Sequence, residues 1–157
     1  MLIKKLLVSI SIILMAIGIS LSITSTSINL YTEAKKYIGI NNYLNNKQSS
    51  YLYVLEIPSI NLKQGIGTNI NKELIMINNN IIAGHSGHCK MCFFNKLDQI
   101  EIGDIVYLYT PYKKIYYVSK INIYDKDKII INNELNLVTC LKLDSTKRLV
   151  IGLNSKE

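Results

Sequence analysis

The chain has 157 residues, enough for one domain and an appendage. Its 18 basic residues outnumber 11 acidic ones and give a formal net charge of +7, yet no block of lysines is longer than two residues. No basic run is interleaved with aromatic residues, so a nucleic-acid partner is not expected, which leaves an anionic cell-envelope partner or lysines scattered for solubility.

The N-terminal segment is a candidate membrane anchor. Residues 6–32 contain no charged side chain, and the strongly apolar part, residues 6–23, approaches the roughly 20 residues that span a bilayer core. Two lysines precede it, so the positive-inside rule predicts a cytoplasmic N-terminus. We predict a cytoplasmic tail at 1–5, a transmembrane anchor at 6–27 and a linker with a helical extension at 28–50. The alternative is a cleaved signal peptide; either way, the remaining domain is extracellular.

From residue 51 onward the sequence changes to short runs typical of β-strands. The runs are separated by Gly, Pro and polar turns, and one short helix is predicted at 94–99. Many short strands at close spacing indicate an all-β domain, a small barrel or a sandwich. The predicted strands are residues 51–57, 61–68, 80–84, 103–110, 113–124, 136–140 and 147–153.

Three residues form a candidate catalytic group: Cys140, His85 and Arg148. Cys140 and His85 each stand where an extended apolar run ends, which is a rigid place from which to face a cleft. Arg148 begins the strand expected to pair with the Cys140 strand, so the two should be neighbours. A thiol, an imidazole and a guanidinium can serve as nucleophile, acid/base and oxyanion clamp. The alternatives are a buried Cys140 and a surface Arg148, although a sole arginine among lysines suggests a need for its planar fork.

The stretch HSGHCKMC offers a second chemistry. Outside the cytoplasm, Cys89 and Cys92 are close enough in sequence to form a disulfide, which leaves Cys140 as the lone thiol. With His85 and His88 they are also the donor types that zinc accepts, but the spacing is poor and no metal is expected. A redox CxxC normally opens a helix in a βαβ unit, which this chain lacks. Two loop cysteines without a dedicated role are the remaining alternative.

The segments VLEIPSINLKQGI, NIIAGHSG, FNKLDQIEIGDIVYLYT and NLVTCLKLDSTKRLVIGL, in this order, resemble the sortases. These are membrane-anchored cysteine transpeptidases of Gram-positive bacteria, and the resemblance covers about residues 51–153. It implies a small closed β-barrel of about eight strands with one or two short helices. The barrel, at 51–157, would be the catalytic domain and would follow the N-terminal transmembrane helix.

The resemblance also implies roles for particular residues. Cys140 would attack the Thr–Gly carbonyl of an LPxTG-type sorting motif, His85 would act as acid and then base, and Arg148 would hold the substrate and stabilise the oxyanion. Thr139, the Thr before Cys in the family's TLxTC motif, would support a substrate contact. The partners would be surface proteins with a C-terminal sorting signal and an amine of a cell-wall precursor or pilin lysine. No cofactor is implied.

The sequence departs from the family pattern at three places. Asn136 stands where the motif has its first Thr, and the segments before AGH and before NLVTC are short. The short segments fall where the family builds its substrate groove, so the chain is a shortened variant. Two alternatives from other classes remain: a degenerate sortase-fold module that binds envelope peptides without catalysis, and a membrane-tethered redox or metal-binding protein that uses Cys89 and Cys92.

Overall fold

The computed structural model describes residues 2–87, 89 and 91–155. Its first element is the helix α1, Leu2–Leu44. The part from Ser9 to Leu44 is long and apolar enough to cross a membrane. Hydroxyl groups within it donate to carbonyls one turn earlier, for example Ser22 to Gly18 and Thr26 to Ser22, which satisfies these side chains without water. The helix thus continues through the region where an extension of the anchor is predicted.

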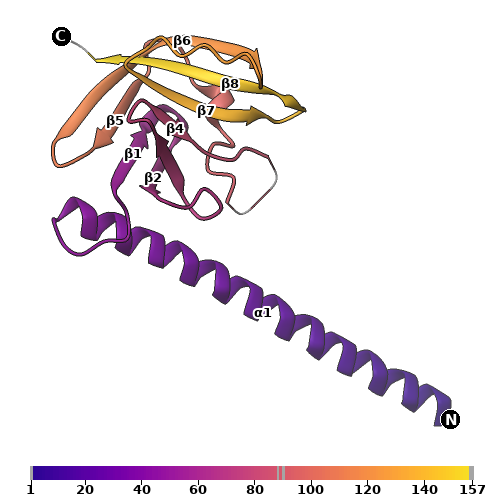
Figure 1. The fold of residues 1–157 in the computed structure, drawn as a ribbon. Coiled ribbons are helices and arrows are strands. Elements are labelled where there is room, and N and C mark those ends of the chain that lie inside the picture. Colours follow the sequence, from indigo (N-terminus) through magenta and orange to yellow (C-terminus); the bar gives the residue numbers. More distant parts are fainter. Residues whose placement is uncertain (1, 88, 90, 156–157) are drawn as a thin grey trace. The chain divides into compact units, whose positions relative to one another are not determined.

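The remainder of the chain forms a closed β-barrel, which clusters as a compact unit from Gly39 onward (Figure 1). Its eight strands follow the order β1-β2-β3-β4-β7-β8-β6-β5 around the barrel. Two short 3-10 helices, η1 (Pro58–Ile60) and η2 (Leu97–Gln99), lie between strands. The strands are β1 (Tyr53–Ile57), β2 (Leu62–Gly67), β3 (Leu74–Ile77), β4 (Ile81–Ala83), β5 (Ile105–Tyr109), β6 (Lys113–Asp125), β7 (Leu135–Leu141) and β8 (Asp144–Ser155).

This architecture confirms the predicted all-β fold with about eight strands in a closed barrel. Strand β3 is not among the predicted strands, because four consecutive apolar residues carry no period that separates a strand from a helix. The turn between β7 and β8 is also shorter than predicted, since only Lys142 and Leu143 lie between the strands.

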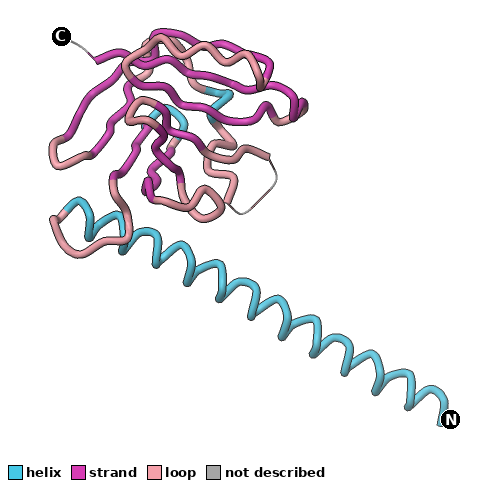
Figure 2. The backbone as a smooth tube through the Cα atoms, in the orientation of Figure 1, coloured by secondary structure: helices cyan, strands magenta, loops and turns pink. Residues whose placement is uncertain are grey.

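The pairing of β4 with β7 places the ends of two distant strands together. The two strands run parallel, with Ala83 opposite Val138, so their C-terminal ends lie at the same end of the barrel. Figure 2 shows the strands of the barrel and the loops that join them. The residue after this strand end and the last residues of β7 are therefore neighbours, although more than fifty positions separate them in sequence.

Inward-facing apolar side chains from all eight strands fill the barrel. Along β7 and β8, Leu137, Leu149 and Ile151 belong to this core, so the residues between them face outward. The outward face supports the site described below. Other fully buried members of the core include Leu55, Ile57, Ile66, Leu74, Ile82, Phe94, Leu97 and Leu153.

The connection between β6 and β7 is short, residues 126–134, and it is fixed to the barrel near its end. The Asn133 amide donates to the Ser119 hydroxyl at 2.8 Å and to the Asn154 side chain at 2.9 Å. A Cβ atom at Gly152 would lie 2.3 Å from Oδ1 of Asn133, so a larger residue there would displace this amide from its hydrogen bonds.

Tyr109 gives the barrel a predicted sensitivity to alkaline pH. Burial, and then its hydrogen bond to the Glu56 carboxylate at 2.8 Å, raise the pKa of Tyr109 from 10.0 to about 12. The folded state therefore keeps the phenol proton that the unfolded state has already lost, and stability falls as the pH rises from 10 to about 12. Denaturant unfolding at several alkaline pH values should show a shallower decline for Tyr109→Phe than for the unmodified chain. Equal slopes would contradict this assignment.

Candidate active site

Cys140 and Arg148 are directly opposite each other on β7 and β8. They are register partners in this antiparallel pair, so their Cβ atoms lie on the same face about 5 Å apart. The preceding pair, Thr139 and Leu149, is buried and faces the other way. This register confirms that Cys140 and Arg148 are neighbours, and it places both side chains on the outward face, partly exposed.

His85 follows the end of β4 by two positions, and hydrogen bonds fix its backbone beside Cys140. Before it, the Gly84 amide donates to the Val138 carbonyl at 3.2 Å. After it, the Ser86 hydroxyl donates to the Cys140 carbonyl. His85 is thus held between two residues that bond to consecutive parts of β7. The structure brings the backbones of the three predicted catalytic residues to one end of the barrel.

Gly84 is the residue at which the chain leaves β4. A Cβ atom there would lie 2.4 Å from Cδ2 of Leu74 and 3.0 Å from Cδ2 of Phe94, both of which are core side chains. Since buried side chains have little room to move aside, only glycine allows the loop to pass so close to the core. The absence of a side chain at Gly84 therefore allows the loop that carries His85 to pass close to the core.

The loop after His85 is closed on itself. The Phe94 amide donates to the His85 carbonyl at 3.0 Å, and the Gly87 amide donates to Oδ1 of Asn95 at 2.6 Å. A disulfide joins Cys89 and Cys92 within this loop. His88 lies outside the described residues. Among the residues that are described, no group of three His, Cys, Asp or Glu side chains is arranged to hold a metal ion.

A cavity of about 430 Å³ lies beside Cys140. Cys140 and Thr139 of β7 and Leu149 of β8 form one wall, and Ser86 and Gly87 belong to the loop after His85. His85 is not among its described lining residues. The remaining lining residues are Phe94, Asp98, Leu141, Lys142 and Leu143. The cavity combines a mainly apolar surface with a thiol at one edge, which suits a peptide that presents an apolar side chain near a reactive carbonyl.

The guanidinium of Arg148 is oriented by the backbone of the β7–β8 hairpin. Its Nη1 donates to the carbonyls of Ser145 and Lys147, each at 2.9 Å. These carbonyls belong to an irregular stretch of β8, where the three residues between Asp144 and Arg148 have no partner on β7. Among the described residues, Nη1 is the donor in every hydrogen bond that the Arg148 guanidinium makes. The remaining nitrogens, Nε and Nη2, are therefore available to a substrate.

Asp144 stabilises the start of β8. Its Oδ1 accepts hydrogen bonds from the side-chain hydroxyl of Thr146, at 2.5 Å, and from the backbone amide of Thr146, at 2.9 Å. These bonds lower the pKa of the Asp144 carboxyl. The carboxylate thus supports the irregular stretch whose carbonyls orient Arg148.

Thr139 is only 3% exposed, and its hydroxyl donates to the Gly84 carbonyl at 2.8 Å. We predict that Thr139→Val destabilises the barrel by about 1–3 kcal/mol, because the buried Gly84 carbonyl loses its side-chain donor. Thr139→Ser keeps the donor and is the matched control. Denaturant unfolding of both variants checks the prediction, and equal destabilisation would show that the methyl group, and not the hydroxyl, matters.

Sequence reasoning missed several residues at this end of the barrel. Asp98 and Lys142 line the cavity and are joined by an ion pair. Tyr124 of β6 lies directly opposite Arg148 and extends the row that begins at Cys140. Lys142 could have been found from the sequence, because it stands two residues after Cys140. Asp98 and Tyr124 are linked to the site only by the tertiary fold.

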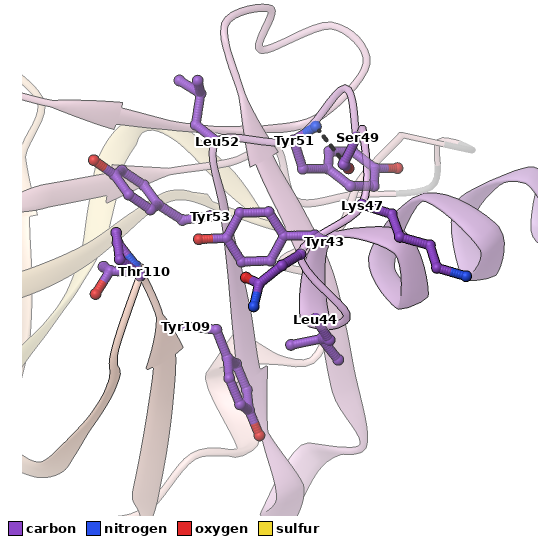
Figure 3. Close-up of a pocket in the computed structure, with 11 residues that line it drawn as sticks. Tyr43, Leu44, Lys47, Ser49, Tyr51, Leu52, Tyr53, Tyr109 and Thr110 are labelled. Atoms are coloured by element: carbon purple, nitrogen blue, oxygen red, sulfur yellow. Dashed lines mark hydrogen bonds between the residues drawn. The ribbon is translucent and has the colours of Figure 1, made fainter.

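A second cavity, of about 560 Å³, is rich in tyrosine and contains none of the predicted catalytic residues. Figure 3 shows the side chains of Tyr43, Tyr53 and Tyr109 around it. The Tyr51 amide nearby donates to the Ser49 hydroxyl at 3.2 Å. Without Cys, His, Asp or Glu among its described lining residues, this cavity is not the candidate active site.

Comparisons with known proteins match the barrel domain. The family model described as Sortase domain matches residues 51–154. No curated protein matches the chain. Solved structures with a similar fold include sortase C-1 from Actinomyces oris, with 18% identity over 69% of this chain and 76% of that one and a TM-score of 0.61. Sortase C1 from Streptococcus agalactiae has 21% identity, coverages of 69% and 68% and a TM-score of 0.59. Sortase A from Corynebacterium diphtheriae has 19% identity, coverages of 71% and 63% and a TM-score of 0.60.

Proposed function

The chain belongs to the sortase family, and we propose that it is a membrane-anchored cysteine transpeptidase that cleaves an LPxTG-type sorting motif and transfers the acyl group to an amine. The observation that carries this proposal is the pair of hydrogen bonds that hold His85 beside β7, from Gly84 to Val138 and from Ser86 to Cys140. Together with the Cys140–Arg148 register, they support a site in which a thiol, an imidazole and a guanidinium act at one strand end.

In the first half of the proposed reaction, the Cys140 thiol gives its proton to His85, and the sulfur attacks the carbonyl carbon of the Thr–Gly bond. Nε and Nη2 of Arg148 donate to the oxygen that becomes negative, and preorganised donors of this kind lower the barrier of acyl transfer. The C–N bond then breaks, His85 gives a proton to the leaving amine, and a thioester remains on Cys140.

In the second half, an incoming amine loses a proton to His85 and attacks the thioester carbon. The C–S bond breaks, the Cys140 thiolate leaves with the electron pair, and a new amide is released. The chemistry uses only side chains of this chain, so no cofactor enters the proposal. Water is the slower alternative acceptor, and its attack gives hydrolysis.

The proposed domain arrangement follows from the anchor and the family. Residues 1–5 are a cytoplasmic tail, 6–27 cross the membrane of a Gram-positive cell, 28–50 connect to the barrel, and 51–157 form the catalytic domain outside the cell. The apolar helix and the two preceding lysines support this orientation. The partners are then surface proteins with a C-terminal sorting signal and an amine of the cell wall or of a pilin.

The test is to incubate the full chain in detergent micelles with a panel of LPxTG-type peptides and an amine, and to record intact mass spectra. We expect a peptide-acyl adduct on Cys140 that disappears when the amine is added, together with the amide product. Absence of an adduct with every peptide would contradict the enzyme and favour a peptide-binding module with a sortase fold.

A further inference from the structure

Asp98 and Lys142 form an ion pair at the cavity beside Cys140. Nζ of Lys142 lies 3.0 Å from Oδ1 and 2.9 Å from Oδ2 of Asp98, so it bonds to both carboxylate oxygens. Asp98 belongs to η2, and Lys142 belongs to the turn two residues beyond Cys140. The two side chains remain 44% and 37% exposed, respectively. The carboxylate is therefore accessible to a solute that enters the cavity.

The cavity holds a reactive thiol and a carboxylate that already binds an alkylammonium group. The proposed reaction uses an acceptor of the same chemistry, because a lysine amine has a pKa near 10.4 and is cationic at neutral pH. A carboxylate is the natural partner of such a cation. In the structure, the Lys142 ammonium group occupies this carboxylate.

We propose that Asp98 recognises the ammonium group of a lysine-type acceptor, and that Lys142 occupies this carboxylate until the acceptor displaces it. This inference rests on the proposed transpeptidase function and adds the recognition of the second substrate. Asp98 is a specificity-determining residue in this scheme, and Lys142 is an internal competitor.

The proton balance of the step is simple. The acceptor arrives as R–NH₃⁺ at Asp98, gives one proton to His85, and attacks the thioester as R–NH₂. The second proton is released when the tetrahedral intermediate collapses to an amide and the Cys140 thiolate. The His85 proton restores the thiol, or stays on the imidazole beside the thiolate, so one proton goes to solvent for each amide formed.

Two charge-removing variants separate this role from a purely structural one. Asp98→Asn keeps the shape of the side chain but removes the charge that attracts the acceptor, so the KM for a cationic amine should rise about fivefold, a factor typical of a partly exposed ion pair. Lys142→Met keeps the length of the side chain but removes the competitor, so the same KM should fall. If the ion pair only stiffens the turn, both variants break it and both should change the KM in the same direction.

The experiment uses the full chain in micelles with the peptide that acylates Cys140 most rapidly. The ratio of aminolysis to hydrolysis is measured against the concentration of three probes: Nα-acetyl-lysine amide, glycinamide and hydroxylamine. Both products come from one acyl-enzyme, so changes in the acylation rate cancel from the ratio. Hydroxylamine is uncharged at neutral pH, and its KM should be the same in all variants. Glu101→Gln removes a carboxylate three residues from Asp98 that does not line the cavity, and it is the matched control.

The results have distinct meanings. Opposite changes in KM for Nα-acetyl-lysine amide, with hydroxylamine unaffected, support the recognition role. A larger effect for the lysine probe than for glycinamide supports a lysine acceptor, whereas equal effects support any cationic amine. Normal acylation with an unchanged KM in Asp98→Asn, or parallel changes in both variants, overturns this inference and leaves the transpeptidase intact. Failure of every peptide to acylate Cys140 overturns both.

Discussion

Replacement of Cys140 with alanine is expected to abolish peptide cleavage and acyl transfer, with a loss in kcat on the order of 10⁴-fold or more. Cys140 is the only cysteine among the described residues that is not in a disulfide. Cys140 lines the cavity and lies directly opposite Arg148. Without the sulfur no thioester can form, so the adduct in the intact mass spectrum should vanish while the barrel remains folded. The alanine is well tolerated at this partly exposed position, and circular dichroism should show an unchanged fold.

The matched control for Cys140→Ala is the double variant Cys89→Ser/Cys92→Ser. It removes the disulfide in the loop after His85 but leaves the proposed nucleophile in place. We expect this variant to form the adduct. Loss of function in the double variant, together with normal function of Cys140→Ala, would reverse the assignment and favour a thiol-redox protein that uses the CxxC pair.

Arg148→Lys is expected to lower kcat/KM by about 10²–10³-fold, the usual effect of removing an oxyanion donor. The Arg148 guanidinium donates through Nη1 to two backbone carbonyls, which orients Nε and Nη2. A lysine keeps the charge but has a single ammonium group, which cannot bond to the hairpin and offer two planar donors to a substrate at the same time. The sole arginine of the chain is thus expected to be irreplaceable by the cation that the chain uses elsewhere.

Thermal unfolding separates the catalytic effect of Arg148→Lys from a structural one. Loss of the two hydrogen bonds to Ser145 and Lys147 should lower the Tm only slightly, because both carbonyls belong to the irregular stretch of β8 and the bond to Ser145 is exposed to water. Lys147→Ala removes the adjacent cation, whose ammonium lies 4.0 Å from Asp144, and it should change neither Tm nor activity appreciably. An Arg148→Lys enzyme within twofold of the original activity would exclude the proposed oxyanion role.

The spacing of apolar residues predicted most of the strands. Alternating or continuous apolar runs marked β1, β2 and β4 to β8, because a strand with one buried face repeats every second residue. Strand β3 was missed because its four apolar residues, Leu74–Ile77, have no period. The closure of the barrel came from the family resemblance, since hydrogen bonds between the first strand and β5 leave no mark in either sequence segment.

The contact between parts of the candidate site could be predicted where they are close in sequence. Cys140 and Arg148 are eight residues apart across one hairpin, so the sequence itself implied that they are neighbours. The link to His85 depends on the parallel pairing of β4 with β7, which connects residues about 55 positions apart. The two strand ends made His85 a candidate partner of Cys140, and the resemblance supported it, but the pairing itself was not predicted. Asp98 could not be predicted at all, because an isolated aspartate in a short helix carries no local signal.

The apolar N-terminal helix, the β character of the remainder and the candidate residues for carbonyl chemistry can be read from the chain, because composition, periodicity and functional groups are local properties. Which of these residues meet depends on the folded barrel. Barrel closure, the β4–β7 register and the glycine at position 84 place His85 beside Cys140 and set Asp98 against Lys142. These contacts depend on the packing of strands far apart in the chain, which no single segment specifies.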